Sequence, residues 1–190
     1  MNLDSAPTAP AARALLAELL AGAPADPAAA LLQLAQRARD RALVVLPLGL
    51  QAATDVRELA SLHAAIALQS VRHGRPMAPT VLVSAGPVLR ADAPAGAADF
   101  LLALALSLDE HPLIHAAACE LAPLGAGSTE SGWGFWAGPE TVRRSLAAGR
   151  PPGPSLLKGE APSLLAALGD AFATDARPQA MLRAVLICME

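Results

Sequence analysis

Continuous apolar runs alternate with amphipathic segments along most of the chain. The apolar runs are short, which predicts buried strands at Leu43–Pro47, Thr80–Ser84, Leu113–Cys119 and Leu182–Met189. Between them, apolar residues recur at helical spacing, which predicts helices at residues 11–20, 28–40, 55–72, 94–108, 139–148 and 162–172. Because strands that are apolar on both faces need cover on both sides, the pattern predicts a three-layer α/β/α fold with a mainly parallel sheet.

Proline and glycine mark the ends of these elements. The 17 Pro and 14 Gly residues predict loops at 73–79 and 124–134 and a turn at 149–154. Val88–Arg90 is predicted to pair back on the preceding strand as a hairpin. We interpret residues 1–25 as an N-terminal arm and residues 26–190 as one α/β domain, because this length suffices for a single core.

Charge and composition argue against several classes of protein. Fourteen Lys and Arg residues against 17 Asp and Glu residues give a net charge of −3, which is not typical of a nucleic-acid binder. The longest apolar run, Phe100–Leu106, is shorter than a membrane span. The segment MNLDSAPTAP does not have the pattern of a signal peptide. We therefore expect a cytoplasmic protein that contacts neither nucleic acid nor membrane.

Histidine and cysteine form no recognisable catalytic or metal-binding pattern. Cys119 and Cys188 end apolar runs, which is typical of buried free thiols, and the sequence has no CxxC motif. His115 lies within an apolar run and is interpreted as a hydrogen-bonded core residue, whereas His63 lies on a predicted helix. These residues predict no metal site.

Two neighbouring stretches are candidates for function. Gly125–Gly132 combines glycine with Ser and Thr after a predicted strand; it is either an anion site built from backbone N–H groups or a plain loop. Trp133, Phe135 and Trp136 are three of the five aromatic residues, and they form either a core plug, which we favour, or an exposed apolar patch. The phosphate-binding patterns GxxxxGK[ST] and GxGxxG are absent from the sequence.

Several segments occur in the order seen in one enzyme family. Residues 43–74, LVVLPLGLQAATDVRELASLHAAIALQSVRHG, resemble the strand, loop and helix that precede the last domain of glycerate 2-kinases; His63 stands where that family has a His in an EHA-type context. Five later segments resemble the family's C-terminal MOFRL domain: PTVLVSAGPVLR, AGAADFLLALALSL, GSTESGWG, LKGEAPSLLAALGDAF and LRAVLI. The resemblance extends over residues 31–190 and implies the MOFRL fold for residues 26–190.

The polar signatures of that family are mostly replaced. Its Gly-Gly-Glu motif is matched by Ala85–Pro87, its Arg-Asn-Gln-Glu by Gly96–Asp99, and its terminal Asn and Asp by the uncharged Pro178–Met181. Thr129–Glu130 stands at a Thr-Asp of the family, and Glu160 stands at another Asp. Because phosphoryl transfer depends on positioned cations and Mg²⁺-binding acids, the replacements imply a scaffold without its catalytic groups.

The resemblance implies one remaining ligand cleft and no catalytic residue. The candidate residues of this cleft are Ser84, Asp99, Ser128, Thr129, Glu130 and Glu160. We predict that Glu130 and Glu160 open onto the same cleft at the carboxyl end of the sheet. Two separate, solvent-exposed acids would also fit the sequence.

The function predicted from the resemblance is that of a stand-alone, degenerate MOFRL-like domain without kinase activity or a cofactor. It would act as an interaction or small-molecule-binding module, in the second case through the old substrate cleft around Thr129 and Glu130. The alternative is the C-terminal subunit of a split glycerate 2-kinase, which transfers a phosphoryl group from ATP to glycerate with Mg²⁺. Under this alternative, the partner is a separately encoded N-terminal half of the kinase. The other expected partner is a second copy of this chain, through self-association.

Overall fold

A six-stranded sheet organises the part of the chain that the computed structural model describes, which is residues 9–50, 55–73, 78–86, 96–121, 132–174 and 181–188. The strands are β1 (Val44–Leu50), β2 (Thr80–Ala85), β3 (Ile114–Leu121), β4 (Gly132–Ala137), β5 (Ala171–Thr174) and β6 (Leu182–Ile187). Their order across the sheet is β1-β2-β6-β3-β4-β5. β1 and β2 are parallel, whereas every other neighbouring pair is antiparallel.

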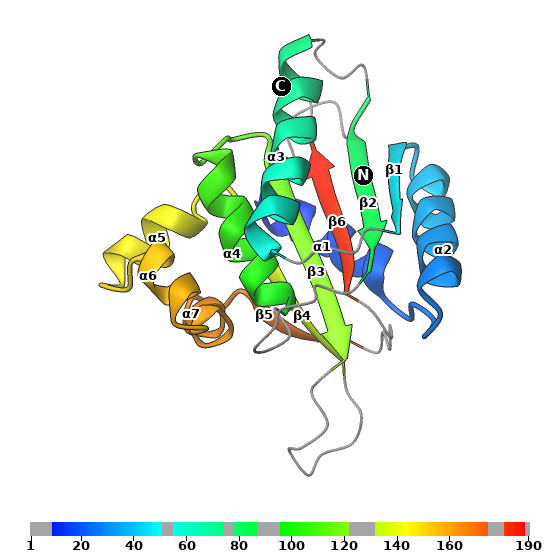
Figure 1. Cartoon of the computed structure of the whole chain (residues 1–190). Helices are drawn as coiled ribbons and strands as arrows, with labels where there is room; N and C mark the ends of the chain where they lie inside the picture. The colour runs from blue at the N-terminus through cyan, green and yellow to red at the C-terminus, as the bar shows by residue number, and fades with distance from the viewer. Residues whose placement is uncertain are drawn as a thin grey trace.

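Helices cover both faces of this sheet. Those within the described residues are α1 (Ala9–Leu20), α2 (Pro27–Asp40), α3 (Val56–His73), α4 (Ala97–Leu108), α5 (Thr141–Ala147), α6 (Pro152–Leu157) and α7 (Ala161–Ala167). α1 and α2 pack on one face, and α3 and α4 pack on the other, so the fold has the three layers that the sequence predicts (Figure 1). The short helices α5, α6 and α7 lie beside α4.

The predicted mainly parallel sheet is wrong, because the sheet is mixed and mostly antiparallel. The last strand, β6, lies between β2 and β3 and runs opposite to both. Every residue of β2 and of β6 is buried. In β2 and β6 the apolar run marks a strand that is covered on both faces, but it does not reveal the strand's direction. The burial predicted for the first strand is wrong, because β1 lies at the edge of the sheet and none of its residues is buried. The prediction that Thr80–Ser84 and Leu113–Cys119 belong to one sheet is confirmed.

Three short elements also differ from their predictions. β4 occupies the end of the loop predicted at 124–134. The helix predicted at 162–172 is the shorter α7, and β5 follows it. Helix α6 replaces the turn predicted at 149–154, because proline at a first helical position favours a helix. The predicted hairpin at Val88–Arg90 lies outside the described residues.

The sheet separates two apolar cores. Leu82 of β2 and Val185 of β6 pack with α3 and α4, whereas Val81 and Leu186 from the same strands pack with α1 and α2. The leucines of α1 that are buried in the second core are Leu15, Leu16, Leu19 and Leu20. The domain boundary near residue 25 stays a prediction, but α1 is packed on the sheet.

Two buried thiols match the sequence analysis. Cys119 and Cys188 are free and buried, and burial raises the pKa of each to about 12. Both side chains are therefore protonated and unreactive at neutral pH. Among the described helices, none combines the length and the hydropathy of a membrane span.

The aromatic residues of β4 point to both cores. Phe135 is buried in the core with α4, and Trp136 is buried in the core with α1. Trp136 stacks on Phe172 of β5, with ring centroids 4.0 Å apart and an interplanar angle of 26°. The interpretation as a core plug is confirmed for Phe135 and Trp136, while the side chain of Trp133 lies outside the description.

Gly134 is required because the ring of Phe172 occupies the space of a side chain at this position. The two residues are opposite one another in the β4–β5 register, and a Cβ at Gly134 would overlap the ring. We expect Gly134→Ala to displace Phe172 from Trp136 and to lower the free energy of unfolding by about 1–3 kcal/mol. Urea denaturation measures the effect. Gly153→Ala is the matched control, because a Cβ there meets nothing within 4 Å; equal stability of the two variants would contradict the prediction.

Candidate functional site

Four residues form a buried polar cluster near the end of β2, on the face covered by α3 and α4. They are His63 of α3, Ser84 of β2, Phe100 of α4 and Arg183 of β6. Ser84 and Arg183 are opposite one another in the β2–β6 register, so both side chains leave the sheet on the same face. His63, Ser84 and Arg183 each have an exposed fraction of 0%. A ligand therefore does not reach these side chains in this structure.

A directed chain of hydrogen bonds runs through the buried polar cluster. Nδ1 of His63 lies 2.8 Å from the carbonyl oxygen of Leu59, which can only accept, so Nδ1 carries the proton. In the neutral ring Nε2 is then an acceptor, and the Ser84 hydroxyl, 2.8 Å away, donates to it. Nε of Arg183 donates to Ser84 Oγ at 2.8 Å. Each group in this chain therefore donates to the next, from Arg183 to Ser84, from Ser84 to His63 and from His63 to the carbonyl of Leu59.

Burial sets the protonation states in the cluster. It lowers the pKa of His63 to about 4; the positive charge of Arg183 acts in the same direction, and the bond to Leu59 opposes it. Burial also lowers the pKa of Arg183 to about 10, which leaves the guanidinium charged at neutral pH. Its Cζ lies 5.6 Å from the centroid of the Phe100 ring, and His63 meets the same ring edge-on at 5.1 Å. Cation–π attraction thus supplements the polar contacts of the charge.

A serine bonded to a neutral histidine is the arrangement that activates hydroxyl nucleophiles in hydrolases and transferases. Catalysis also requires that the hydroxyl reach a substrate atom. The Ser84 hydroxyl already donates to His63 and accepts from Arg183, and it is fully buried. The geometry therefore supports a structural role for the pair, which joins α3 to β2 and β6.

Two acids lie next to the cluster at the start of α4. Asp99 is buried, and its Oδ2 accepts a bond from the Gly96 N–H at 3.0 Å, which caps the helix. Glu120 of β3 accepts a bond from the Ala97 N–H. Burial raises the pKa of Glu120, and the charge of Asp99 adds to this effect. A Cβ at Gly96 would overlap the Glu120 carboxylate, so glycine allows this close approach.

The structure describes three of the six predicted site residues, which are Ser84, Asp99 and Glu160. Ser84 is in the buried polar cluster, and Asp99 precedes Phe100 of that cluster. Glu160 is exposed just before α7, with Oε2 4.0 Å from Nη2 of Arg150. The remaining predicted positions, Ser128, Thr129 and Glu130, lie outside the described residues. The convergence of Glu130 and Glu160 on one cleft therefore stays a prediction.

Sequence analysis missed the roles of His63, Arg183 and Glu120. The signal for Arg183 is a single charge inside the apolar run LRAVLI, because a charged residue is seldom fully buried without polar partners. Glu120 likewise ends the apolar run of β3. Among the described residues, no group of three or more His, Cys, Asp or Glu side chains could hold a metal ion.

Comparison with known proteins identifies the fold. Neither a protein-family model nor a curated protein sequence matches the chain at a significant level. Glycerate kinase from Thermotoga maritima is similar in structure, with a TM-score of 0.69 and 16% identity over 84% of this chain and 40% of that one. The PH0495 protein from Pyrococcus horikoshii gives a TM-score of 0.66 and 12% identity over 87% and 39% of the two chains. The chain thus has a glycerate-kinase-like domain fold and spans about 40% of the length of these proteins.

Proposed function

We propose that the chain is a degenerate, non-catalytic MOFRL-like domain that serves as an interaction or small-molecule-binding module. The order of its segments resembles the C-terminal domain of glycerate 2-kinases, and its fold is similar to part of one glycerate kinase. The observation that carries the proposal is the state of His63, Ser84 and Arg183. Their polar groups are buried and bonded to one another instead of being presented to a phosphate or a hydroxyl group.

Two acids near the start of α4, Asp99 and Glu120, also support this proposal. A kinase uses carboxylates to hold Mg²⁺ and cations to neutralise the transferred phosphoryl group. Asp99 and Glu120 each accept a bond from a backbone N–H at the start of α4. Ala97 and Ala98 stand where the resemblance places the amide side chains of Asn and Gln, and both are fully buried. These positions therefore contribute packing and helix capping in place of phosphate contacts.

The isolated chain is expected to show no glycerate-dependent consumption of ATP. A coupled assay with D-glycerate, ATP and Mg²⁺ measures it, with Thermotoga maritima glycerate kinase as the positive control. Turnover at an ordinary enzyme rate, on the order of 1–10³ per second, would contradict the proposal. A thermal-shift series with each compound alone then tests small-molecule binding, because a ligand at 100 times its Kd stabilises the folded state by about 2.7 kcal/mol.

The second candidate is the C-terminal subunit of a split glycerate 2-kinase. It is favoured by the edge strand β1, where Val44 is 46% exposed and Leu50 is 61% exposed. Apolar side chains on an open strand edge are a surface that another chain could cover. Adding a separately encoded N-terminal half should then produce ATP consumption that neither chain shows alone. Variants Val44→Lys and Leu50→Lys should reduce that activity, whereas Leu32→Lys on α2 is the exposed control.

A further inference from the structure

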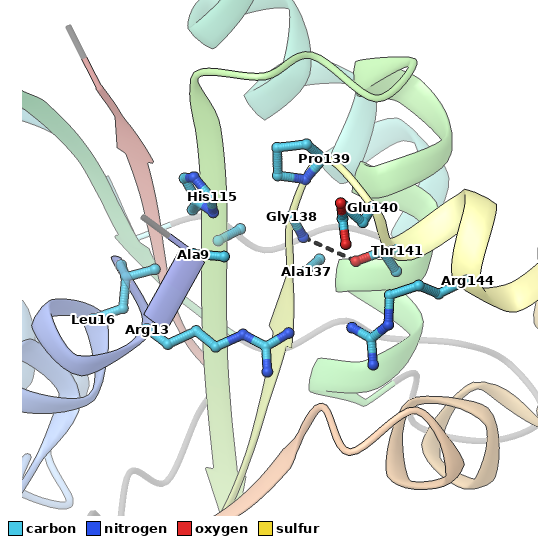
Figure 2. A pocket seen from close by; sticks show the side chains of 11 residues that line it. Ala9, Arg13, Leu16, His115, Ala137, Gly138, Pro139, Glu140, Thr141 and Arg144 are labelled. Carbon is cyan, nitrogen blue, oxygen red and sulfur yellow. Dashed lines mark hydrogen bonds between the residues drawn. The ribbon is translucent and has the colours of Figure 1, made fainter. Parts of the chain in front are cut away.

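A small pocket lies away from the buried polar cluster, near the start of β3. It is lined by residues from α1, β3, the end of β4 and the start of α5. Its volume is about 40 Å³. The polar side chains that line it are Arg13, His115, Glu140, Thr141 and Arg144. Figure 2 shows the guanidinium groups of Arg13 and Arg144 reaching in from opposite sides, with Glu140 and Thr141 between β4 and α5. The buried polar cluster shares none of these residues.

A buried carboxylate holds the two arginines in place. Nη2 of Arg13 lies 2.5 Å from Oδ1 of Asp170, and Nη1 of Arg144 lies 3.0 Å from each oxygen of that carboxylate. Asp170 is 0% exposed, whereas the side chains of Arg13 and Arg144 are 37% and 30% exposed. Two positive charges thus share one negative charge. Asp170 fixes the orientation of both guanidinium groups and leaves an excess of one positive charge.

Other groups at the pocket do not cancel this excess. Glu140 lines the pocket, but its Oε1 forms an ion pair with Nη2 of Arg143 at 2.8 Å, so these two charges offset each other. Burial lowers the pKa of His115, and the nearby Arg13 adds to the effect, so the ring is neutral at physiological pH. The net charge of +1 matches one monovalent anion.

The pocket also offers hydrogen-bond donors. Arg13 has no further hydrogen-bond partner among the described residues beyond Asp170, which leaves its Nε and Nη1 for another acceptor. Oγ1 of Thr141 accepts a bond from the Gly138 N–H at 2.9 Å, so the hydroxyl proton is the part that can donate to a ligand. A water molecule needs about 10–15 Å³ of the volume of a pocket, so the volume of about 40 Å³ has room for about three water molecules. A carboxylate group has three heavy atoms.

We propose that this pocket binds the carboxylate of a small organic acid. The guanidinium of Arg13 donates to the carboxylate, Arg144 supplies the second positive charge, and the Thr141 hydroxyl donates from the side of α5. A planar carboxylate matches the fork of N–H groups on an arginine. A phosphate dianion is less well matched, because its two negative charges exceed the net charge of +1 at the pocket. The inference does not depend on the proposed function, since the two sites share no residue.

An NMR titration of the full chain at constant ionic strength tests the inference. Acetate, D-glycerate and inorganic phosphate are added separately, and the Nε–H signals of Arg13 and Arg144 and the imidazole of His115 are followed. Acetate or D-glycerate should give saturable shifts with a Kd in the millimolar range. Shifts that sodium chloride reproduces, or phosphate binding tighter than binding of either carboxylate, would overturn the inference.

Two arginine variants complete the test. Arg13→Gln should weaken carboxylate binding at least tenfold, whereas Arg39→Gln, an exposed control on α2, should leave the Kd unchanged. If Arg13→Gln does not fold, Arg13→Lys keeps a positive charge beside Asp170 and should still weaken binding severalfold through loss of the fork. An unchanged Kd in a folded Arg13 variant would show that the ion pair only holds α1 on the sheet.

Discussion

Arg183→Ala is expected to lower the free energy of unfolding by about 3–5 kcal/mol. Arg183 is among the largest side chains of the described residues that are fully buried, and its removal leaves a cavity between β6 and Phe100. It also removes the donor that Ser84 Oγ accepts from, and a buried polar atom that loses its partner costs about 1–3 kcal/mol. Urea denaturation at pH 7 measures the loss.

Arg183→Met separates the volume of this side chain from its charge. Methionine fills most of the same space without the cost of burying a cation, so we expect a loss below about 1.5 kcal/mol. The exposed Arg39→Ala serves as the control, with an expected change within about 0.5 kcal/mol. If Arg183→Ala were no more costly than Arg39→Ala, the packing role of Arg183 would be refuted. If Arg183→Met were as costly as Arg183→Ala, the charge itself would be what the fold requires.

The apolar pattern predicts the layers of this fold because burial is recorded in the sequence. The predicted strands at 80–84 and 182–189 coincide with β2 and β6, whose residues are all buried. Strand direction is not recorded in the same way. It depends on the path of the chain between strands. Between β3 and β6 the chain forms β4, α5, α6, α7 and β5, and β6 then takes its place between β2 and β3. A run of buried residues fits either direction equally well.

The buried polar cluster was hidden from sequence reasoning for a different reason. His63, Ser84 and Arg183 are separated by 21 and 99 positions along the chain. Ser84 meets Arg183 through the antiparallel pairing of β2 and β6, and His63 meets Ser84 because α3 packs on this face of the sheet. The mainly parallel sheet predicted from the sequence does not include this antiparallel pairing, so it did not predict that Arg183 lies opposite Ser84. The wrong topology and the missed cluster therefore have one origin. Apart from the single charge of Arg183 in an apolar run, these residues alone resemble ordinary core or helix residues.

The pocket at α1 was missed because its charges lie on separate amphipathic helices. Arg13 and Arg144 are ordinary polar positions of α1 and α5 when each helix is considered by itself. They come together through Asp170, a single buried acid between α7 and β5. Only the tertiary structure shows that one acid serves two arginines.

Acid should destabilise the protein through His63. Its pKa is about 4 in the folded protein, against an ordinary value of 6.5 that applies to the unfolded chain. Between these two pKa values the unfolded chain binds more protons than the folded one. The contribution of neutral His63 to the free energy of unfolding is therefore fully present above about pH 6.5 and decreases as the pH falls toward 4. A difference of about 2.5 pKa units corresponds to a loss of about 3 kcal/mol. Urea denaturation from pH 7 to pH 4 measures this loss.

The variant His63→Gln isolates the contribution of this residue. Burial also lowers the pKa of His115, which acts in the same direction, whereas the raised pKa of Glu120 stabilises the fold as the pH falls. Both effects remain in His63→Gln, so the difference between the two pH profiles belongs to His63. We expect the wild type to lose about 3 kcal/mol more than the variant between pH 7 and pH 4. Parallel profiles would show that His63 does not bind its proton more weakly in the folded state, and the direction assigned to the Ser84–His63 hydrogen bond would then lose its support.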